Sequence, residues 1–493
     1  MNITFIAKGA ESIGLEYISA VLKQHGHKVS LVFDRALFND DTYINIPWLK
    51  GLLKPVSIVA KEALNENPDI IGFSVLTNAY SWSLAVAREI KKIKNVPIIF
   101  GGIHPTLVPE EVMSNKEVDI VCRGEGEYAL LELVESIGSG KQDYSIQNLW
   151  FKNKNAVIRN ELRAPIADLD TLPLPDKSLF EGHIPMNYYY MAMVSRGCAY
   201  ACSYCSEICI KTLYKNKGSY YRQRSVNKVI DEFLVMKQKY NFKAIDIKSS
   251  SLSDSGEWIC NFLEEYKYKV ALPFRAMLHP KTVDDKLARA LKSAGCNQIQ
   301  VGVQTFNPSL RKDILKRSET NADVSQALNS LGRFNVKFSV DLMTGLPGEN
   351  KGDLLLAANE LVKCKNLYKI GLFYLQYLPK TPITEYAKDC GRLTETEVIN
   401  INKGGINNFF TANNAREISR LRDFQLLFRL LPILPRWLVK LILKFNIYKA
   451  FHYIPQVFLI VFIDIMSAFS ARDYFTVFTL KGYLWEMKRK ILK

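Results

Sequence analysis

The run Cys198-Ala199-Tyr200-Ala201-Cys202-Ser203-Tyr204-Cys205 holds three cysteines, separated by three and then two residues. A four-iron, four-sulfur cluster normally takes four cysteine ligands, so a compact set of three leaves one iron free for a small molecule. A structural zinc site with Cys209 as fourth ligand is one alternative, and cysteines that only pack are another. Zinc ribbons usually bring two separated ligand pairs, and no second pair follows in this sequence. The spacing therefore favours an iron-sulfur cluster.

This run resembles the signature of the radical S-adenosylmethionine (SAM) enzymes, which is Cys-x3-Cys-x2-Cys with an aromatic residue before the third cysteine. Tyr204 holds the aromatic position, and Ser195-Arg196-Gly197 precede the run as in many members. The resemblance implies a [4Fe-4S] cluster on Cys198, Cys202 and Cys205. It also implies SAM on the open iron, cleavage of SAM to a 5′-deoxyadenosyl radical, and an electron donor such as flavodoxin or ferredoxin.

Size and composition indicate a folded protein of several domains. The chain has 493 residues, of which 48% are apolar and 23% charged. Nine cysteines, most of them scattered, and the lack of a signal peptide at the first residues predict a reducing cytoplasm. The net charge of +16 is compatible with nucleic acid or with an anionic membrane. Because ten basic and three acidic residues lie among apolar runs in 436–493, we expect a membrane surface and no nucleic acid.

Residues 1–142 alternate short apolar strands with amphipathic helices, which predicts a doubly wound parallel sheet of the α/β class. Such sheets bind ligands beyond the carboxyl ends of their strands. The expected strands are 3–7, 29–33, 70–75, 98–100 and 120–122, and the expected helices include 14–25 and 80–91.

Three strand ends in this region resemble the cobalamin-binding domain: Gly9-Ala10-Glu11-Ser12-Ile13-Gly14, Ser74-Val75-Leu76-Thr77 and Gly101-Gly102-Ile103-His104. Glu11 stands where that family has its axial histidine, a departure shared by radical SAM proteins with an attached cobalamin domain. The phrase Arg123-Gly124-Glu125-Gly126-Glu127 is also typical of that combined family. A flavodoxin-like or response-regulator-like domain is the alternative. The residues that the resemblance assigns to cobalamin are Glu11, Ser12, Gly14, Ser74, Leu76, Thr77, Gly101, Gly102, His104 and Glu125. For His104 the alternative is a hydrogen-bonding role within its loop only.

A proline-containing linker, 143–187, is expected to join this domain to a second one, 188–393. In 188–393 six strands alternate with helices at distances that need crossover connections, so we predict a partial (β/α)6 barrel, which is the radical SAM barrel by resemblance. The expected strands are 190–194, 244–248, 271–277, 298–304, 337–344 and 369–377.

Several motifs lie at the carboxyl ends of these strands, where active-site groups collect in barrels. The segment Lys248-Ser249-Ser250 lacks the acidic pair that often binds the amino group of SAM, and Asp254 is a candidate substitute. The SAM contacts implied by the resemblance are Tyr204, Ser249, Ser250, Gln304, Gly345, Leu346 and Pro347. Arg275 is a further candidate, because its guanidinium can bind a carboxylate or phosphate with two donors, and a surface ion pair is the alternative for it.

Residues 394–493 are predicted to be helical, apolar and basic. The apolar run 454–471 is close to membrane-spanning length but contains Gln456 and Asp464, so helices lying in the interface are favoured. A single transmembrane helix, a soluble cap over the barrel and a dimer face are the alternatives. In the interfacial model the residues at headgroup level are Trp437, Tyr448, Tyr453, Tyr474 and Trp485, and the lipid-facing basic residues include Arg436, Lys440, Lys444 and 488–490.

The sequence therefore predicts a cytoplasmic cobalamin-dependent radical SAM enzyme, peripheral at the inner face of the membrane. By resemblance it transfers a methyl group to an unactivated carbon of a small substrate, which the apolar tail suggests is hydrophobic, such as a lipid or an isoprenoid. A cyclase or oxidative rearrangement enzyme with the same cofactors is the first alternative. A membrane-docked cobalamin or iron-sulfur protein without catalysis is the second.

Overall fold

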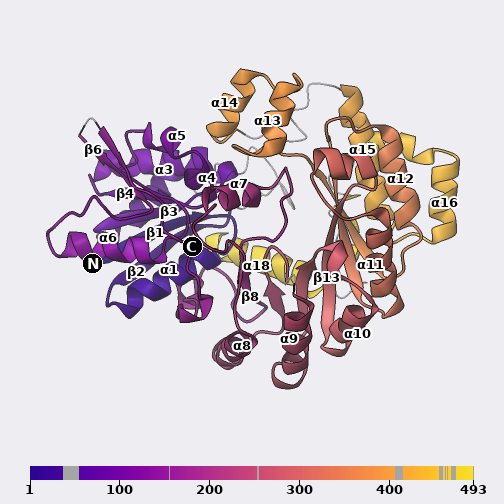
Figure 1. Cartoon of the computed structure of the whole chain (residues 1–493), viewed down its shortest axis with the longest axis horizontal. Coiled ribbons are helices and arrows are strands. Elements are labelled where there is room, and N and C mark those ends of the chain that lie inside the picture. The colour runs from indigo at the N-terminus through magenta and orange to yellow at the C-terminus, as the bar shows by residue number, and fades with distance from the viewer. Residues whose placement is uncertain are drawn as a thin grey trace.

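The computed structural model describes residues 1–36, 55–154, 156–252, 255–405, 415–454, 459–460, 462–463, 465–467 and 473–491. Figure 1 shows two α/β bodies side by side, with the helices that follow the second body packed around it. Asp254 and most of the apolar run 454–471 lie outside the described residues.

The first body is a seven-stranded sheet in the order β2-β1-β3-β4-β5-β6-β7. Its first five strands are parallel and match the five predicted ones. The five central residues of β1 are all buried, because helices cover both faces of a doubly wound sheet. The strands are β1 (Asn2–Lys8), β2 (Lys28–Asp34), β3 (Ile70–Ser74), β4 (Ile98–Gly101), β5 (Ile120–Cys122), β6 (Leu149–Asn153) and β7 (Ala156–Arg159).

Helices α1 (Ile13–Gln24) and α6 (Glu127–Gly138) pack on one face of this sheet, and α2 (Val56–Leu64) and α3 (Tyr80–Ile93) pack on the other. The antiparallel strands β6 and β7 extend the sheet into residues that the sequence assigned to the linker. Trp150 and Phe151 of β6 are buried, so this part of the expected connector belongs to the first core.

The second body is a six-stranded parallel sheet in the order β15-β14-β13-β12-β11-β8. It does not close, because β8 and β15 are its two edges, and the predicted partial barrel is confirmed. The strands are β8 (Tyr190–Ala192), β11 (Ile245–Ile247), β12 (Phe274–Leu278), β13 (Cys296–Gln304), β14 (Lys337–Thr344) and β15 (Leu367–Tyr374).

The helices that alternate with the strands cover the outside of the barrel and share one core with the alternate, outward side chains of those strands. Ile299, Val301 and Val303 of β13 belong to that core, so Gln298, Gln300 and the other intervening residues face inward. The covering helices are α8 (Val226–Tyr240), α9 (Gly256–Lys269), α10 (Asp285–Ser293), α11 (Asn321–Arg333) and α12 (Lys351–Leu361).

The C-terminal segment is helical, as predicted, and much of it packs against the barrel. Phe424, Leu427 and Tyr448 belong to the barrel's outer core. Tyr448 is fully buried, so its predicted place at headgroup level is wrong, because its ring packs on Phe424 instead. The elements are α13 (Pro382–Asp389), α14 (Glu395–Asn402), α15 (Ala415–Leu430), α16 (Arg436–Lys444), the 3-10 segment η7 (Ile447–Tyr453) and α18 (Tyr474–Ile491).

Helix α18 lies beside β8, where Phe475 and Phe478 stack with Tyr188 and Tyr189. Figure 1 shows it running between the two bodies toward the first one. Asp473, just before α18, accepts a hydrogen bond from Gln298 on the inner face of the barrel. Among the described residues, no helix combines the length and apolar character needed to cross a bilayer.

Candidate active site

Two neighbouring cavities lie where the first body meets the barrel. One, of about 230 Å³, is lined mainly by the first body; the other, of about 330 Å³, is lined mainly by the barrel. They share five lining residues from both bodies, which are Gly102, Gly124, Glu125, Met193 and Arg196. The carboxyl ends of the two parallel sheets therefore open onto one continuous site.

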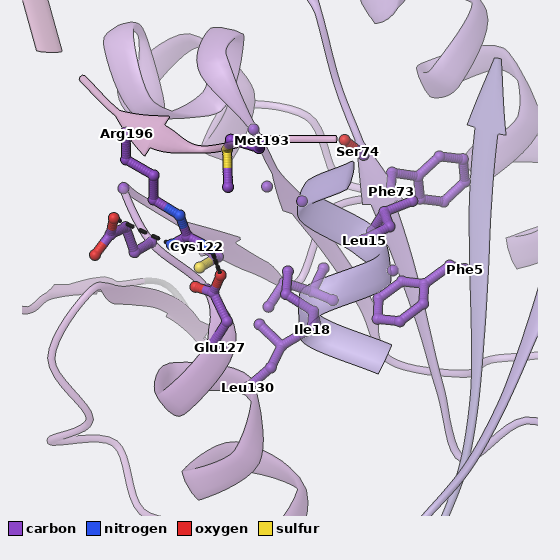
Figure 2. A pocket seen from close by; sticks show the side chains of 18 residues that line it. Phe5, Leu15, Ile18, Phe73, Ser74, Cys122, Glu127, Leu130, Met193 and Arg196 are labelled. Atoms are coloured by element: carbon purple, nitrogen blue, oxygen red, sulfur yellow. Dashed lines mark hydrogen bonds and ion pairs between the residues drawn. The ribbon is translucent and has the colours of Figure 1, made fainter. Parts of the chain in front are cut away.

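The first cavity is bordered by several residues with no side chain to obstruct a ligand (Figure 2). A Cβ at Gly14 would meet no atom within 4 Å, Gly101 ends β4, and Gly102 follows it directly. Gly102 has φ +103°, and a Cβ there would come within 2.9 Å of the backbone nitrogen and oxygen of Val75. Only glycine fits that turn, which brings the backbone to the cavity wall.

Of the residues predicted to bind cobalamin, Gly14, Ser74, Gly101, Gly102 and Glu125 line this cavity. The other five do not line either cavity. Leu76 is half exposed beyond β3, and Ser12 caps α1 by accepting a hydrogen bond from Leu15 N. The remaining three, Glu11, Thr77 and His104, have other partners.

Glu11 does not face the first cavity, because its carboxylate pairs with the buried Lys177 at 2.7 Å. Lys177 comes from the linker and also pairs with Glu16 of α1 at 2.7 Å. Its ammonium donates a third bond to the carbonyl of Met191 in β8, so it ties the first body to the barrel. The structure thus gives Glu11 a structural partner in place of the predicted cofactor contact.

His104 is fully buried in α4 (Ile103–Leu107), where it stacks on Tyr80. Its Nδ1 lies 3.3 Å from Oγ1 of Thr77, so the two predicted residues contact each other. Burial lowers the pKa of His104 to about 4, and the ring is neutral at pH 7. This environment is that of a core histidine.

The three cysteines lie in the loop between β9 (Ser195–Arg196) and helix α7 (Ser206–Leu213), next to the second cavity. Burial is the main cause that raises the pKa of the Cys205 thiol to about 12, and the nearby charges of Glu207, Cys202 and Cys198 act in the same direction. Among the described residues, no group of three or more His, Cys, Asp or Glu side chains is placed to hold a single metal ion. Cys209 lies on α7 and contacts the carbonyl oxygen of Lys380.

Two arginines of the barrel hold the cysteine loop against the first body. Arg196 pairs with Glu127 at 2.5 Å and with Glu125 at 3.1 Å, and Arg222 pairs with Glu125 at 2.9 Å. Figure 2 shows Arg196 reaching Glu127 beside the first cavity. The acidic residues of the Arg123–Glu127 motif therefore position the loop, and Glu125 lines the cavities as an ion-pair partner.

A buried group of charged residues that the sequence does not predict lies on the other side of the cysteine loop. Arg317 donates to Gly302 O at 2.6 Å, to Tyr204 Oη at 3.1 Å and to Cys202 Sγ at 3.8 Å. It also pairs with Glu319, which His279 contacts at 3.2 Å. Burial opposes ionisation of Glu319, but His279 and Arg317 outweigh it and lower its pKa to about 2.

His279 itself stacks on Tyr200 of the loop, with ring centroids 3.8 Å apart. Its position directly after β12 was the available signal, because functional groups collect at strand ends in barrels. Arg317 and Glu319 gave no such signal, since a buried ion pair far from a strand end looks like surface charge in a sequence.

The predicted SAM residues separate into those near the cysteine loop and those with other roles. Gln304 ends β13 with φ +67°, an uncommon conformation for a residue other than glycine that often marks functional sites. Gly345 has φ +80° against the ring of Tyr374, and Leu346 packs in a core that includes Tyr204. Pro347, which follows Leu346, is buried.

The side chains of Ser249 and Arg275 have partners within the protein. The Ser249 hydroxyl accepts hydrogen bonds from the backbone of Val194 and Ser195, just before the cysteine loop. Arg275 forms a two-point ion pair with Asp246. Ser250 is exposed and lines the second cavity.

Two family models match the chain: the B12 binding domain over residues 6–134 and the radical SAM superfamily over residues 193–361. This chain is a radical SAM enzyme with a cobalamin-binding domain. The predicted family, fold class and cofactors are therefore confirmed: a [4Fe-4S] cluster, SAM and cobalamin.

Individual relatives of this radical SAM enzyme have diverse functions. An uncharacterized methyltransferase of Pyrococcus horikoshii is 26% identical over 75% of this chain and 76% of its own length. The anaerobic magnesium-protoporphyrin IX monomethyl ester cyclase of Rubrivivax gelatinosus is 24% identical over 71% of this chain and 63% of its own. The cobalamin-dependent SAM radical enzyme OxsB, solved with aqua-cobalamin and SAM, has the same fold, with TM-score 0.68 and 14% identity over 99% of this chain and 79% of OxsB.

The described residues fit these cofactors. The first cavity, bordered by Gly14 and Gly102, has the backbone-lined shape that a cobalamin tail needs. Cys198, Cys202 and Cys205, which lie together in one short loop, would hold the cluster through three of its irons. The individual SAM and cobalamin contacts stay predictions.

Proposed function

We propose that this enzyme transfers a methyl group to an unactivated carbon of a small substrate. The observation that supports the proposal is the pair of adjoining cavities, which share Gly102, Met193 and Arg196 and so open the cobalamin side and the cluster side to the same substrate. When bound, the cluster would supply the electron that cleaves SAM, and cobalamin would carry the methyl group.

The chain's own residues would orient these groups and restrict solvent. Arg196 and Arg222 fix the cysteine loop against Glu125 and Glu127, so the two cofactor sites keep a constant separation. Side chains held by such buried pairs are positioned precisely, which favours a reaction between two bound groups. An electron donor such as flavodoxin or ferredoxin is part of this proposal.

A cyclase is the second candidate, and the relative from Rubrivivax gelatinosus favours it. The test is anaerobic incubation of the reconstituted enzyme with reductant, SAM carrying a trideuterated methyl group, and a metabolite extract of a strain lacking this protein. Methyl transfer predicts a product that carries the three deuterium atoms. A product formed only with SAM but without deuterium contradicts methyl transfer and supports the cyclase.

The sequence-based expectation of a lipid-like substrate rested on the apolar C-terminal segment. Much of that apolar surface packs on the barrel, as Phe424, Leu427 and Tyr448 show. These residues therefore explain the apolar composition of the segment without a hydrophobic substrate.

We also propose that the face of α16 turned away from the barrel lies on an anionic membrane. Trp437, Leu441 and Phe445 are 64%, 39% and 65% exposed and recur at four-residue spacing along this face. The segment 431–454 contains four basic residues and no acidic one. An exposed apolar stripe beside basic residues suits an anionic lipid surface.

Sedimentation with vesicles tests this surface. The protein should sediment with vesicles that contain phosphatidylglycerol, and the triple variant Trp437→Ser, Leu441→Ser, Phe445→Ser should stay in the supernatant. Tyr268→Ser on α9 is the control, because Tyr268 is 74% exposed but belongs to another face. Equal sedimentation of the triple variant and the wild type would contradict the proposal.

A further inference from the structure

The inner face of the barrel carries a group of charged side chains that the proposed reaction does not yet use. Ile245 and Ile247 of β11 pack outward in the helix-covered core, so Asp246 and the following Lys248 lie on the inward side. Arg275 of β12 lies opposite Asp246 in the strand register. Three charges are therefore gathered within the barrel.

The carboxylate of Asp246 is already committed to Arg275. The guanidinium donates from Nε at 2.7 Å and from Nη2 at 2.6 Å, which is the two-point geometry of a strong pair. Lys248 Nζ lies 3.4 Å from the same Oδ2 that accepts from Nη2. Two cations thus share one anion, and Lys248 has the weaker contact.

The next carboxylate on this face, that of Asp341, offsets little of the positive charge of the two cations. Asp341 of β14 accepts a hydrogen bond from Gln300 at 2.6 Å, and burial raises its pKa. The charges of Lys369 and Lys248 act on it in the opposite direction. Asp473 adds a third carboxylate near Arg275, so Arg275, Lys248 and Lys369 face three acids on this side. Lys248 itself keeps only its 3.4 Å contact with the carboxylate of Asp246, which Arg275 already holds.

Lys248 is the member of this group that a ligand can reach. It lines the second cavity together with Ser250 and Met193, and 36% of its side chain is exposed. Burial, and then the neighbouring Arg275, lower the pKa of its ammonium. A partly buried cation beside another cation is unfavourable unless an anion joins it.

We propose that Lys248 binds an anionic group, a carboxylate or a phosphate, of a molecule that occupies the second cavity. This inference rests on the proposed function, because the cavity is the same reaction site. Two molecules can bring the anion: SAM through its carboxylate, or the substrate through a substituent of its own. In the second case the substrate is polar at one end, and the inference replaces the expectation of a wholly hydrophobic substrate.

The experiment compares wild type with Lys248→Gln, which removes the charge, and Lys248→Arg, which keeps it. Lys243→Gln is the matched control, because Lys243 is an exposed lysine just before β11 that contacts Asn241. Each reconstituted protein is measured for SAM affinity by equilibrium dialysis. Each is then incubated with SAM, reductant and metabolite extract from a strain lacking this protein, and the consumed compounds are separated by anion exchange at pH 7.

If the anion belongs to SAM, Lys248→Gln weakens SAM binding by about tenfold or more and Lys248→Arg restores most of it. If it belongs to the substrate, SAM affinity is unchanged, the compound consumed by the wild type is retained on the anion exchanger, and Lys248→Gln consumes about tenfold less of it. The inference is overturned if SAM affinity is unchanged and either no anionic compound is consumed or Lys248→Gln consumes it as the wild type does. Failure of methyl transfer is seen separately, as an unmethylated product.

Discussion

Gly102 shows how a single residue shapes the cobalamin side of the site. Its positive φ and its approach to the Val75 backbone leave no room for a side chain, while its own backbone forms part of the cavity wall. The adjacent Gly101 makes only ordinary contacts at its would-be Cβ, so the two glycines of this pair have different roles.

Replacing Gly102 by alanine should therefore reduce cobalamin binding strongly. The new Cβ would force the β4 turn away from Val75, which deforms the first cavity. Hydroxocobalamin retained after gel filtration, per mole of folded protein, is the measurement. Gly26→Ala is the control, because Gly26 has φ +81° but no atom within 4 Å of a Cβ, so it reports only the backbone cost of about 1 kcal/mol. Equal loss of cobalamin in both variants would show that the Val75 contact is irrelevant.

The buried His104 should make the protein less stable in mild acid. Its folded pKa of about 4 lies below the ordinary value of 6.5, so the unfolded chain binds the proton first as the pH falls. The stabilisation that the neutral His104 ring contributes is fully present above pH 6.5 and is lost as the pH falls to 4. The titration of His104 alone should lower the free energy of unfolding by about 2 kcal/mol between pH 7 and pH 5.

Urea unfolding of wild type and His104→Gln at both pH values checks this. The variant has no titrating ring, so its unfolding free energy should fall less between pH 7 and pH 5 than that of the wild type. The same pH dependence in both proteins would mean that the imidazole is not held neutral by burial.

At the scale of elements, the sequence predicted strands and helices well where a periodic pattern and a chemical motif coincided. The cysteine loop was found because its three ligands are contiguous, and the barrel strands because apolar runs alternate with helices. The hairpin β6–β7 was missed, since short runs such as those around Trp150 and Val157 do not distinguish a strand from a linker. The orientation of the C-terminal helices was also beyond prediction, because Tyr448 and Trp437 are both amphipathic aromatic residues, yet the first is buried and the second is exposed.

The least predictable feature was the ion-pair connection between elements that are distant in sequence. Lys177, in the expected linker, pairs with Glu11 and Glu16 of the first body and contacts the carbonyl of Met191 in the barrel. Burial raises the pKa of Glu16, and Lys177 acts in the opposite direction, so the shared lysine favours the ionised form of this buried acid.

Lys177→Met should destabilise the protein by about 3 to 5 kcal/mol, because it leaves two buried carboxylates without a cation. The triple variant Lys177→Met, Glu11→Gln, Glu16→Gln should regain much of that loss, since it also removes both charges. Chemical unfolding of the three proteins is the measurement. If the single and triple variants were equally unstable, the ion pairs would not be the cause.

At the scale of the whole molecule, the two sheets direct their carboxyl ends at each other. Lys177 of the linker contacts both bodies, and α18 packs on the barrel and comes close to Arg35 of the first body at Gly482. The sequence predicted both bodies but not the residues at their boundary, since Arg196, Arg222 and Lys248 acquire their roles only through partners on other elements. The central claim is that the cysteine loop beside this boundary carries the cluster that cleaves SAM.

The most direct test is to quantify 5′-deoxyadenosine after anaerobic reduction of the reconstituted enzyme with SAM. The wild type should form it, and Cys202→Ala should form none above the enzyme-free background, while Cys209→Ala should behave like the wild type because its thiol lies on α7 against Lys380. Formation of 5′-deoxyadenosine by Cys202→Ala at the wild-type level would contradict the account.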